Sequence, residues 1–367
     1  MSLPAPSALA MRMDPERHGG SLPAQHGETP LLQLRDVRRQ FRVGHGKVLR
    51  AVDGVSLTIS EREVLGLVGE SGCGKTTLGR MVVGLLERSG GEILYRSEAL
   101  PDRYGPAEFR RYGRRIQMIF QDPYSSLDPR MTLREIVAEG PLLHGMWRRG
   151  DVAERVAEEL RRVGLSPDFM SRYPHEFSGG QRQRVGIARA LALEPEVVVC
   201  DEPISALDVS VQAQVVNLLA DLKETIGLTL LFIAHDLSMI RYVSDRIAVM
   251  YLGRIVELGR ADDVYFRPSH PYTQSLVAAN PVAEWTRARR GERPPARGEV
   301  PSPVNLPPGC RFAGRCPEVQ PACREHDPAL VQLGERNVAC LRRTEDPEVT
   351  LRIQRGGGSL PVDAAGE

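Results

Sequence analysis

The residues from Gly69 to Thr76 read GESGCGKT, which is the spacing of a phosphate-binding loop. In such a loop the backbone N–H groups converge on phosphate oxygens, the lysine reaches the outer phosphates and the final hydroxyl binds Mg²⁺. An apolar strand pattern precedes this stretch and a helical pattern follows it, as the motif requires. We therefore expect a nucleotide phosphate site made by Gly69, Glu70, Ser71, Gly72, Cys73, Gly74, Lys75, Thr76 and Thr77, with Cys73 as a small filler.

Two consecutive carboxylates, Asp201 and Glu202, follow the apolar run VVVC. The carboxyl end of a buried parallel strand is where α/β folds bind their ligands. Taken alone, this pattern marks an ordinary strand end about as often as a ligand-binding site. Beside a phosphate loop it predicts that Asp201 holds Mg²⁺ and that Glu202 orients or deprotonates an attacking water.

Four of the six cysteines lie close together near the C-terminus, at Cys310, Cys316, Cys323 and Cys340. Their spacing, C-x5-C-x6-C-x16-C, lacks the C-x2-C pairs of zinc ribbons and matches no ferredoxin run. A small segment with few apolar residues usually needs a cross-link such as a metal to be stable. We also expect the flanking arginines to lower the pKa values of the thiols. The spacing alone leaves a metal, a cluster and free thiols open.

The elements around these residues alternate between strands and helices, which predicts an α/β fold. Apolar runs predict strands, and residues that share a face at helical spacing predict helices. We expect one helix over Thr77–Leu86 and another over Asp151–Val163, with Asp151 as its N-cap. The expected strands are 31–37, 48–59, 63–69, 196–202 and 228–234, followed by a hairpin over 246–259 that turns at Gly253.

A length of 367 residues suggests about two domains. We expect a disordered leader over 1–30, a nucleotide-binding domain over 31–270, a C-terminal extension with the four cysteines over 271–345, and a disordered tail over 346–367. The Pro- and Arg-rich stretch 287–297 has the composition of a linker.

Composition excludes some classes of function. With 48 basic and 47 acidic residues the net charge is +1, so no global field attracts the chain to nucleic acid or to an anionic membrane. No apolar run approaches the roughly 18 to 20 residues that cross a bilayer. Charged residues interrupt any signal peptide, so we expect a cytosolic protein. Structural disulfides are rare there, and clustered cysteines more often serve a metal, a cluster or catalysis.

The stretch from Phe177 to Leu191, FSGGQRQRVGIARAL, closely resembles the LSGGQ signature of ABC ATPases, with Phe177 in place of the usual Leu. Its serine and glycines open a helix and therefore present N–H groups and a hydroxyl to an anion. In that family the signature faces ATP held by a second subunit, so the resemblance implies a head-to-tail dimer with two ATPs between the subunits. The residues concerned are Ser178, Gly179, Gly180 and Gln181.

Other family marks stand in order along the chain: Gln121 in FQDP, Asp208 in SALD and His235 in IAHD. The resemblance implies a RecA-like core with an antiparallel β-subdomain and a helical subdomain. It implies that Gln121 touches Mg²⁺ or water, that His235 contacts the γ-phosphate and that Asp208 contacts the second subunit. Glu202, His235, Gln121 and Lys75 would be catalytic. Phe41 matches the position that stacks on adenine, with core packing as the alternative.

Longer strings resemble the peptide-importer ATPases of bacteria, in particular their F-type subunit. They include FQDPYSSLDPRMTL, CDEPISALDVSVQAQVVNLL and HPYTQSL at His270–Leu276, and the likeness spans roughly residues 31–345. It implies a subunit peripheral on the cytoplasmic membrane face, with a D-type ATPase partner, two permeases and an external substrate-binding protein. Residues 122–131 would dock on a permease. Importers of nickel, glutathione or another solute are the alternative; a soluble ABC ATPase and an iron-sulfur sensor are less favoured.

The same family carries C-R-F-x-x-R-C-P in its C-terminal module, as at Cys310–Pro317 here. Some members bind a 4Fe-4S cluster through four such cysteines. The resemblance thus implies ATP, Mg²⁺ and a 4Fe-4S cluster as cofactors, with zinc or unmetallated thiols as alternatives at the cysteines. The implied cluster ligands are Cys310, Cys316, Cys323 and Cys340.

Overall fold

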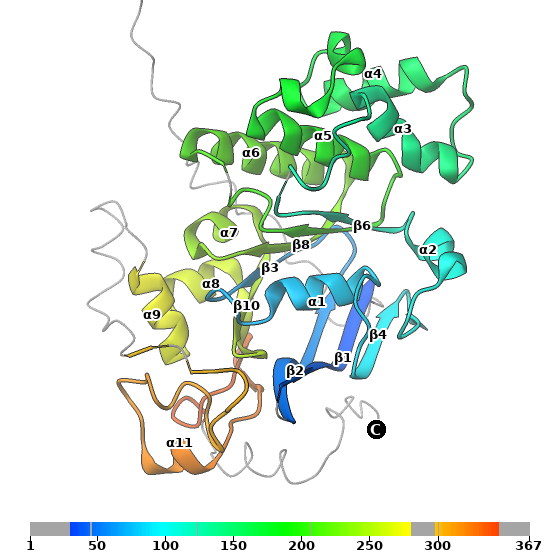
Figure 1. The fold of residues 1–367 in the computed structure, drawn as a ribbon. Coiled ribbons are helices and arrows are strands. Elements are labelled where there is room, and N and C mark those ends of the chain that lie inside the picture. Colours follow the sequence, from blue (N-terminus) through cyan, green and yellow to red (C-terminus); the bar gives the residue numbers. More distant parts are fainter. Residues whose placement is uncertain are drawn as a thin grey trace, which may run out of the picture.

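A computed structural model of the chain describes residues 30–344, apart from residues 45, 123, 206, 280–297 and 300 (Figure 1). The expected leader up to residue 29, the linker and the tail lie outside the described residues. Among those described, no helix is long and apolar enough to cross a membrane.

The centre of the fold is an eight-stranded sheet of order β11-β12-β10-β9-β3-β8-β7-β6. Five neighbouring strands are parallel, from β9 to β6. Every residue of β3, β7 and β8 is buried, because helices cover both faces of a parallel sheet. The bounds are β3 Val64–Val68, β6 Ile116–Ile119, β7 Val197–Asp201, β8 Thr229–Ala234, β9 Arg246–Tyr251, β10 Arg254–Arg260, β11 Val331–Leu333 and β12 Arg336–Val338.

A second, antiparallel sheet of order β2-β1-β4-β5 lies beside α1 (Figure 1). Its inward-facing residues share one apolar cluster with α1 and with strands of the main sheet. The expected strands 31–37 and 48–59 are confirmed, and the first is longer than expected. The bounds are β1 Leu32–Val43, β2 Lys47–Ile59, β4 Gly90–Tyr95 and β5 Glu98–Ala99.

Four helices form a layer at one end of the molecule, and the segment 301–344 lies at the other end (Figure 1). The layer consists of α3 Leu133–Leu143, α4 Val152–Arg162, α5 Gly179–Leu191 and α6 Val209–Ile226. The remaining helices are α1 Lys75–Val82, α2 Pro106–Tyr112, α7 Leu237–Val243, α8 Ala261–Phe266, α9 Pro271–Ala279 and α11 Pro321–Glu325, with short 3-10 turns at Pro167–Ser171 and Pro174–Glu176.

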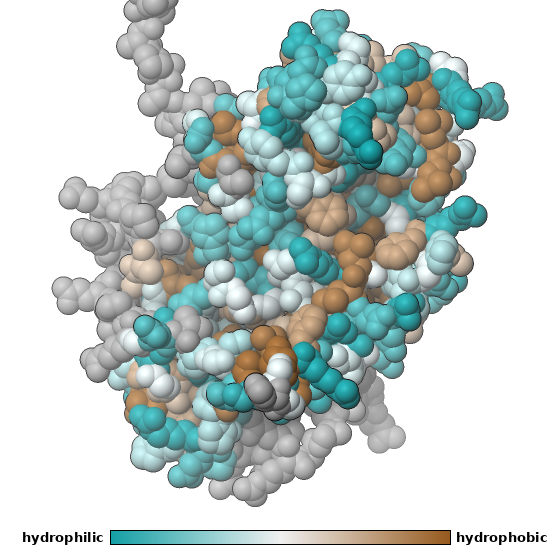
Figure 2. Space-filling view, in the orientation of Figure 1, coloured by the Kyte–Doolittle hydropathy of each residue, from teal (hydrophilic) through white to brown (hydrophobic). Residues whose placement is uncertain are grey.

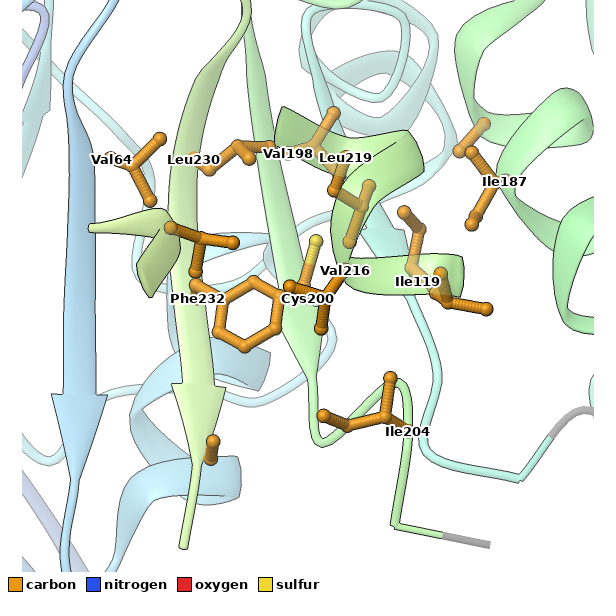
Figure 3. Close-up of a cluster of buried hydrophobic side chains, with 14 of the residues drawn as sticks. Val64, Ile119, Ile187, Val198, Cys200, Ile204, Val216, Leu219, Leu230 and Phe232 are labelled. Atoms are coloured by element: carbon orange, nitrogen blue, oxygen red, sulfur yellow. The ribbon is translucent and has the colours of Figure 1, made fainter. Parts of the chain in front are cut away.

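The larger apolar core joins the parallel strands to the helical layer. Figure 3 shows Val198, Cys200 and Phe232 of β7 and β8 facing Val216 and Leu219 of α6. Burying such side chains stabilises the fold by about 1.5 to 3 kcal/mol each. This packing fixes the strand ends that carry the candidate catalytic residues.

The bounds expected for the first helix need correction. The first helix begins at Lys75 rather than Thr77 and ends at Val82 rather than Leu86, because Gly84 adopts a φ of 77° that no helix continues. Asp151 is the N-cap residue of α4, as expected, although its side chain makes no capping hydrogen bond. The hairpin at Gly253 is confirmed: Leu252 and Gly253 both have positive φ, as a two-residue turn requires.

The expected boundary at residue 270 stays a prediction. In the structure the C-terminal segment is continuous with the main sheet, since β12 pairs with β10 through Glu257 and Leu258. Its own apolar cluster is small, with Ala313, Cys323 and Leu341 at its centre.

Candidate functional site

The phosphate loop lies between β3 and α1, as its sequence predicts. Glycines are required at two close approaches. A Cβ on Gly69 would stand 2.2 Å from the Met250 carbonyl oxygen, and one on Gly74 would stand 2.1 Å from that of Ala51. Gly74 also has a φ of 111°, which L side chains rarely adopt. The loop backbone is thereby packed tightly against β9 and β2.

The side chain of Lys75 is only 4% exposed and folds back over the loop. Its ammonium donates to the carbonyl oxygens of Gly69 at 2.8 Å and Glu70 at 3.2 Å. Glu202 Oε1 lies 3.7 Å from the same nitrogen. A compact cation held at this depth suits the outer phosphates of a nucleotide. Cys73 is buried in the loop, as expected of a filler, and burial raises the pKa of its thiol.

A hydroxyl and a carboxylate meet where Mg²⁺ is expected. Thr76 Oγ1 donates to Asp201 Oδ1 at 2.8 Å, joining the start of α1 to the end of β7. Burial raises the pKa of Asp201, which places a poorly solvated carboxyl group beside the phosphate loop. Oxygen donors of this kind fit Mg²⁺, which is held by one or two protein groups together with phosphates.

Glu202 is the residue on which the other predicted catalytic groups converge. Gln121 Nε2 donates to Glu202 Oε2 at 3.3 Å, and His235 Nδ1 lies 3.6 Å from the same oxygen. The His235 side chain is 60% exposed, so a ligand can reach it. Glu202 has a φ of 43°, a strained backbone conformation that a non-glycine residue adopts only where its surroundings impose it. Its N–H donates to the Ile233 carbonyl of β8 at 3.0 Å.

The signature residues lie on the helical layer, at the start of α5. Ser178 is the N-cap: its hydroxyl accepts from the Gln181 N–H at 3.3 Å, and the Gln181 amide oxygen accepts from the Ser178 N–H at 3.0 Å. Gly180 is required because a Cβ there would stand 2.3 Å from Val211 of α6. Ser178 is exposed and Gly179 partly exposed, and Asp208 is exposed before α6. Their contacts within this chain leave them open to another molecule.

Phe41 pairs with Leu49 in the register of β1 and β2. Its ring is half-buried and carries the Arg39 guanidinium 4.6 Å from its centroid. The ring is therefore outside the closed core, and its adenine role stays a prediction.

The four C-terminal cysteines line one cavity of about 20 Å³, together with His270 and Phe312. All are free thiols. That volume holds about one water, and within the described residues no set of three or more metal-ligating side chains is arranged to hold a metal ion. The expected lowering of thiol pKa is wrong. Burial raises the pKa of Cys310 to about 12 and also raises those of Cys316 and Cys340.

The arginines beside these cysteines contact the nucleotide-binding region instead, which the sequence reasoning missed. Arg315 donates to both carboxylate oxygens of Glu70, at 2.7 and 3.0 Å. The Tyr272 hydroxyl accepts from the Glu70 N–H at 2.9 Å. Both residues lie in strings that the sequence singles out, CRFAGRCP and HPYTQSL, and those strings were the available signal.

The chain matches two known protein families. A family described as "ABC transporter" matches residues 52–205, and one described as "Oligopeptide/dipeptide transporter, C-terminal region" matches residues 256–323. The YkfD protein of Bacillus subtilis is 52% identical over 313 residues, covering 85% of this chain and 95% of its own. The oligopeptide transport ATP-binding protein OppF of Escherichia coli is 48% identical over 326 residues, covering 86% and 97%.

Solved structures share the fold of the larger part of the chain. The cbiO1 subunit of an ABC transporter complex from Clostridium perfringens superposes with a TM-score of 0.58 at 27% identity, over 65% of this chain and 92% of its own. A dimeric ATP-binding cassette, MJ0796, in a post-hydrolysis state with ADP and phosphate gives a TM-score of 0.58 at 28% identity, over 63% and 98%.

Proposed function

The chain belongs to the ATP-binding subunits of oligopeptide and dipeptide ABC transporters, and we propose that it hydrolyses ATP to energise peptide import through membrane permeases. The ABC ATPase fold expected from the sequence is confirmed. The observation that carries the proposal is the convergence of Lys75, Gln121 and His235 on Glu202, beside the Thr76–Asp201 pair.

Each residue has a role that its position supports. Lys75 exchanges the carbonyls of Gly69 and Glu70 for the outer phosphates, because a phosphate is the stronger partner for its ammonium. When bound, Mg²⁺ would neutralise the charge that develops on the phosphate groups. Thr76 and Asp201 would hold it.

Hydrolysis needs an attacking water held in line with the γ-phosphate. Glu202 is the acceptor for its proton, since the carboxylate stands at the end of β7 among groups that orient it. Gln121 and His235 both approach Glu202 Oε2 and so restrict the position of that water.

A second ATPase subunit would complete each site. The start of α5 leaves Ser178 exposed and Gly179 and Gln181 partly exposed on the helical layer, and Asp208 is exposed before α6. Helix N-termini of this kind bind anions. In a head-to-tail pair they would reach ATP on the partner, which we propose to be a D-type subunit. Closure on ATP and reopening after hydrolysis would drive the permeases.

Residues 122–131 are the proposed permease-docking surface on the cytoplasmic membrane face. Tyr124 is 61% exposed, with the Arg182 guanidinium 4.0 Å from its ring centroid. α3 follows at once and ends in exposed Leu142 and Leu143. In Figure 2 apolar side chains gather over the region of α3, next to polar ones. An exposed apolar patch with a polar rim suits a protein partner.

For the thiol cavity we propose a 4Fe-4S cluster held by Cys310, Cys316, Cys323 and Cys340. Four free thiols lining one cavity support it, and thiolates are the ligands of such clusters. The cavity of about 20 Å³ requires that the thiols separate to admit the cluster. Iron and acid-labile sulfide in anaerobically purified protein, lost in Cys316→Ser, would support the cluster. Zinc alone, or no metal, would overturn it.

Peptide import is tested by uptake of labelled di- and oligopeptides in a strain lacking this subunit. The wild-type gene should restore uptake and Glu202→Gln should not. Restored uptake of nickel or glutathione without peptide uptake would assign the subunit to an importer of those solutes instead.

A further inference from the structure

Glu70, the second residue of the phosphate loop, is held by side chains from the C-terminal part of the chain. The Arg315 guanidinium donates two hydrogen bonds, of 2.7 and 3.0 Å, to the Glu70 carboxylate. The Tyr272 hydroxyl accepts the Glu70 N–H at 2.9 Å. A bidentate pair of arginine and carboxylate fixes the relative orientation of the two side chains and is stronger than a single hydrogen bond. Both the side chain and the backbone of Glu70 are therefore positioned from outside the loop.

Arg315 is itself held in place. The residue is 8% exposed, and its guanidinium lies 5.9 Å from the ring centroid of Tyr251 and 5.8 Å from that of Phe312. The rings of Tyr251, Tyr272 and Phe312 contact one another at centroid distances between 4.5 and 5.4 Å. This aromatic packing restricts the rotamers of the arginine side chain. Forming the hydrogen bonds to Glu70 therefore costs little conformational entropy.

Tyr272 is positioned by a separate set of bonds at the start of α9. The buried Glu257 carboxylate accepts the N–H groups of Ser269 at 2.8 Å and His270 at 2.9 Å. His270 Nδ1 accepts the Tyr272 N–H at 3.0 Å, acting as the cap of the helix. The string HPYT thus orients one hydroxyl towards the loop.

A second arginine fixes the other side of the loop. Arg311 donates to the Leu252 carbonyl and to the Asp53 carboxylate. The next residue, Gly253, donates its N–H to the Cys73 carbonyl at 2.9 Å. Arg315 therefore contacts the loop directly at Glu70, and Arg311 holds the turn whose Gly253 bonds Cys73.

We propose that Arg315 and Tyr272 are positioning residues for the phosphate loop, so that the C-terminal segment sets the affinity of the site for Mg-ATP. This rests on the proposed ATPase function. The Lys75 ammonium donates to the Glu70 carbonyl oxygen at 3.2 Å. The position of Glu70 therefore affects the position of the lysine that binds the phosphates. Arg315 also neutralises a carboxylate that would otherwise repel them. Tyr272 and Arg315 both contact Glu70 of the loop, so we assign them as positioning residues rather than catalytic ones.

The test is equilibrium binding of Mg-ATP to the full-length chain. Arg315→Gln should weaken binding roughly tenfold, because a charge-assisted pair at this site is lost and Glu70 is left unpaired. Arg315→Lys should recover part of the loss. Removing both charges, in Arg315→Gln with Glu70→Gln, should bind better than Arg315→Gln alone. A merely structural role would not produce that recovery. Tyr272→Phe keeps the ring and should still weaken binding, since only the hydroxyl acceptor is removed.

Arg342→Gln is the matched control. Arg342 lies in the same segment and pairs with Glu318 at 3.8 Å, away from the loop, so its loss should leave binding unchanged. Wild-type affinity in both Arg315→Gln and Tyr272→Phe would overturn the inference. Equal weakening in Arg342→Gln would also overturn it, by pointing to general destabilisation. If the wild-type chain itself bound no Mg-ATP, the proposed function would fail first.

Discussion

The hydroxyl of Thr76 lies 2.8 Å from Asp201 Oδ1, although 125 positions separate the two residues in the chain. The bond joins the first turn of α1 to the end of β7, and so places two oxygen donors at one point beside the phosphate loop. We infer that this point is where Mg²⁺ meets the protein.

Removing the Thr76 hydroxyl should therefore affect the metal before it affects the fold. Thr76→Val keeps the shape of the side chain. It should raise the Mg²⁺ concentration needed for half-maximal ATP hydrolysis by about ten- to a hundredfold, the range found when a metal site is disturbed. Titration of activity against Mg²⁺ measures this shift. Thr76→Ser retains the hydroxyl and should stay close to wild type. An unchanged Mg²⁺ requirement in Thr76→Val would contradict the assignment.

His235 should matter for turnover more than for binding. His235 Nδ1 lies 3.6 Å from Glu202 Oε2 and the side chain is exposed to a ligand. His235→Ala should lower kcat by roughly a hundredfold, in the range for a group that positions a proton transfer, with a much smaller change in KM. His326→Ala, a histidine in the C-terminal segment far along the chain, serves as the control. A raised KM at an unchanged kcat would assign His235 to binding alone.

Much of this site was predictable because its parts are local in sequence. The loop GESGCGKT, the carboxylates after VVVC and the histidine after LTLLFIA each follow an apolar strand, and parallel strands bring their carboxyl ends to one edge. Hydrophobic runs likewise predicted β3, β7 and β8, which are fully buried.

What the sequence did not predict depends on contacts across the chain. The φ of 43° at Glu202 accompanies a hydrogen bond from its N–H to Ile233 of β8, and neither can be read from the residue types. The arginines near the cysteines were expected to act on the thiols, whereas they reach 245 residues back to Glu70 and 258 residues back to Asp53. Burial therefore governs the thiol pKa values.

Acid should destabilise the chain through His270. Burial lowers the pKa of this histidine from 6.5 to about 3, so the folded state stays neutral where the unfolded state takes up a proton. The free energy of unfolding should then fall as pH drops below 6.5, by on the order of 1 kcal/mol per pH unit, until about pH 3. Burial raises the pKa of Glu257, which acts in the opposite sense, so the contribution of His270 must be isolated by a variant.

His270→Asn provides that comparison, because asparagine also caps helices but does not titrate. The midpoint of thermal unfolding, measured between about pH 7 and pH 5, should fall less steeply in the variant than in the wild type. Parallel pH profiles for the two proteins would show that His270 does not carry the effect.

Single-turnover hydrolysis by Glu202→Gln tests most directly whether Glu202 acts on the water that attacks ATP. The variant should bind Mg-ATP with near wild-type affinity and hydrolyse it at least about a hundredfold more slowly, because the proton acceptor is lost. Glu224→Gln, an exposed glutamate on α6, should hydrolyse normally. Hydrolysis by Glu202→Gln at the wild-type rate would contradict the role of Glu202 as proton acceptor.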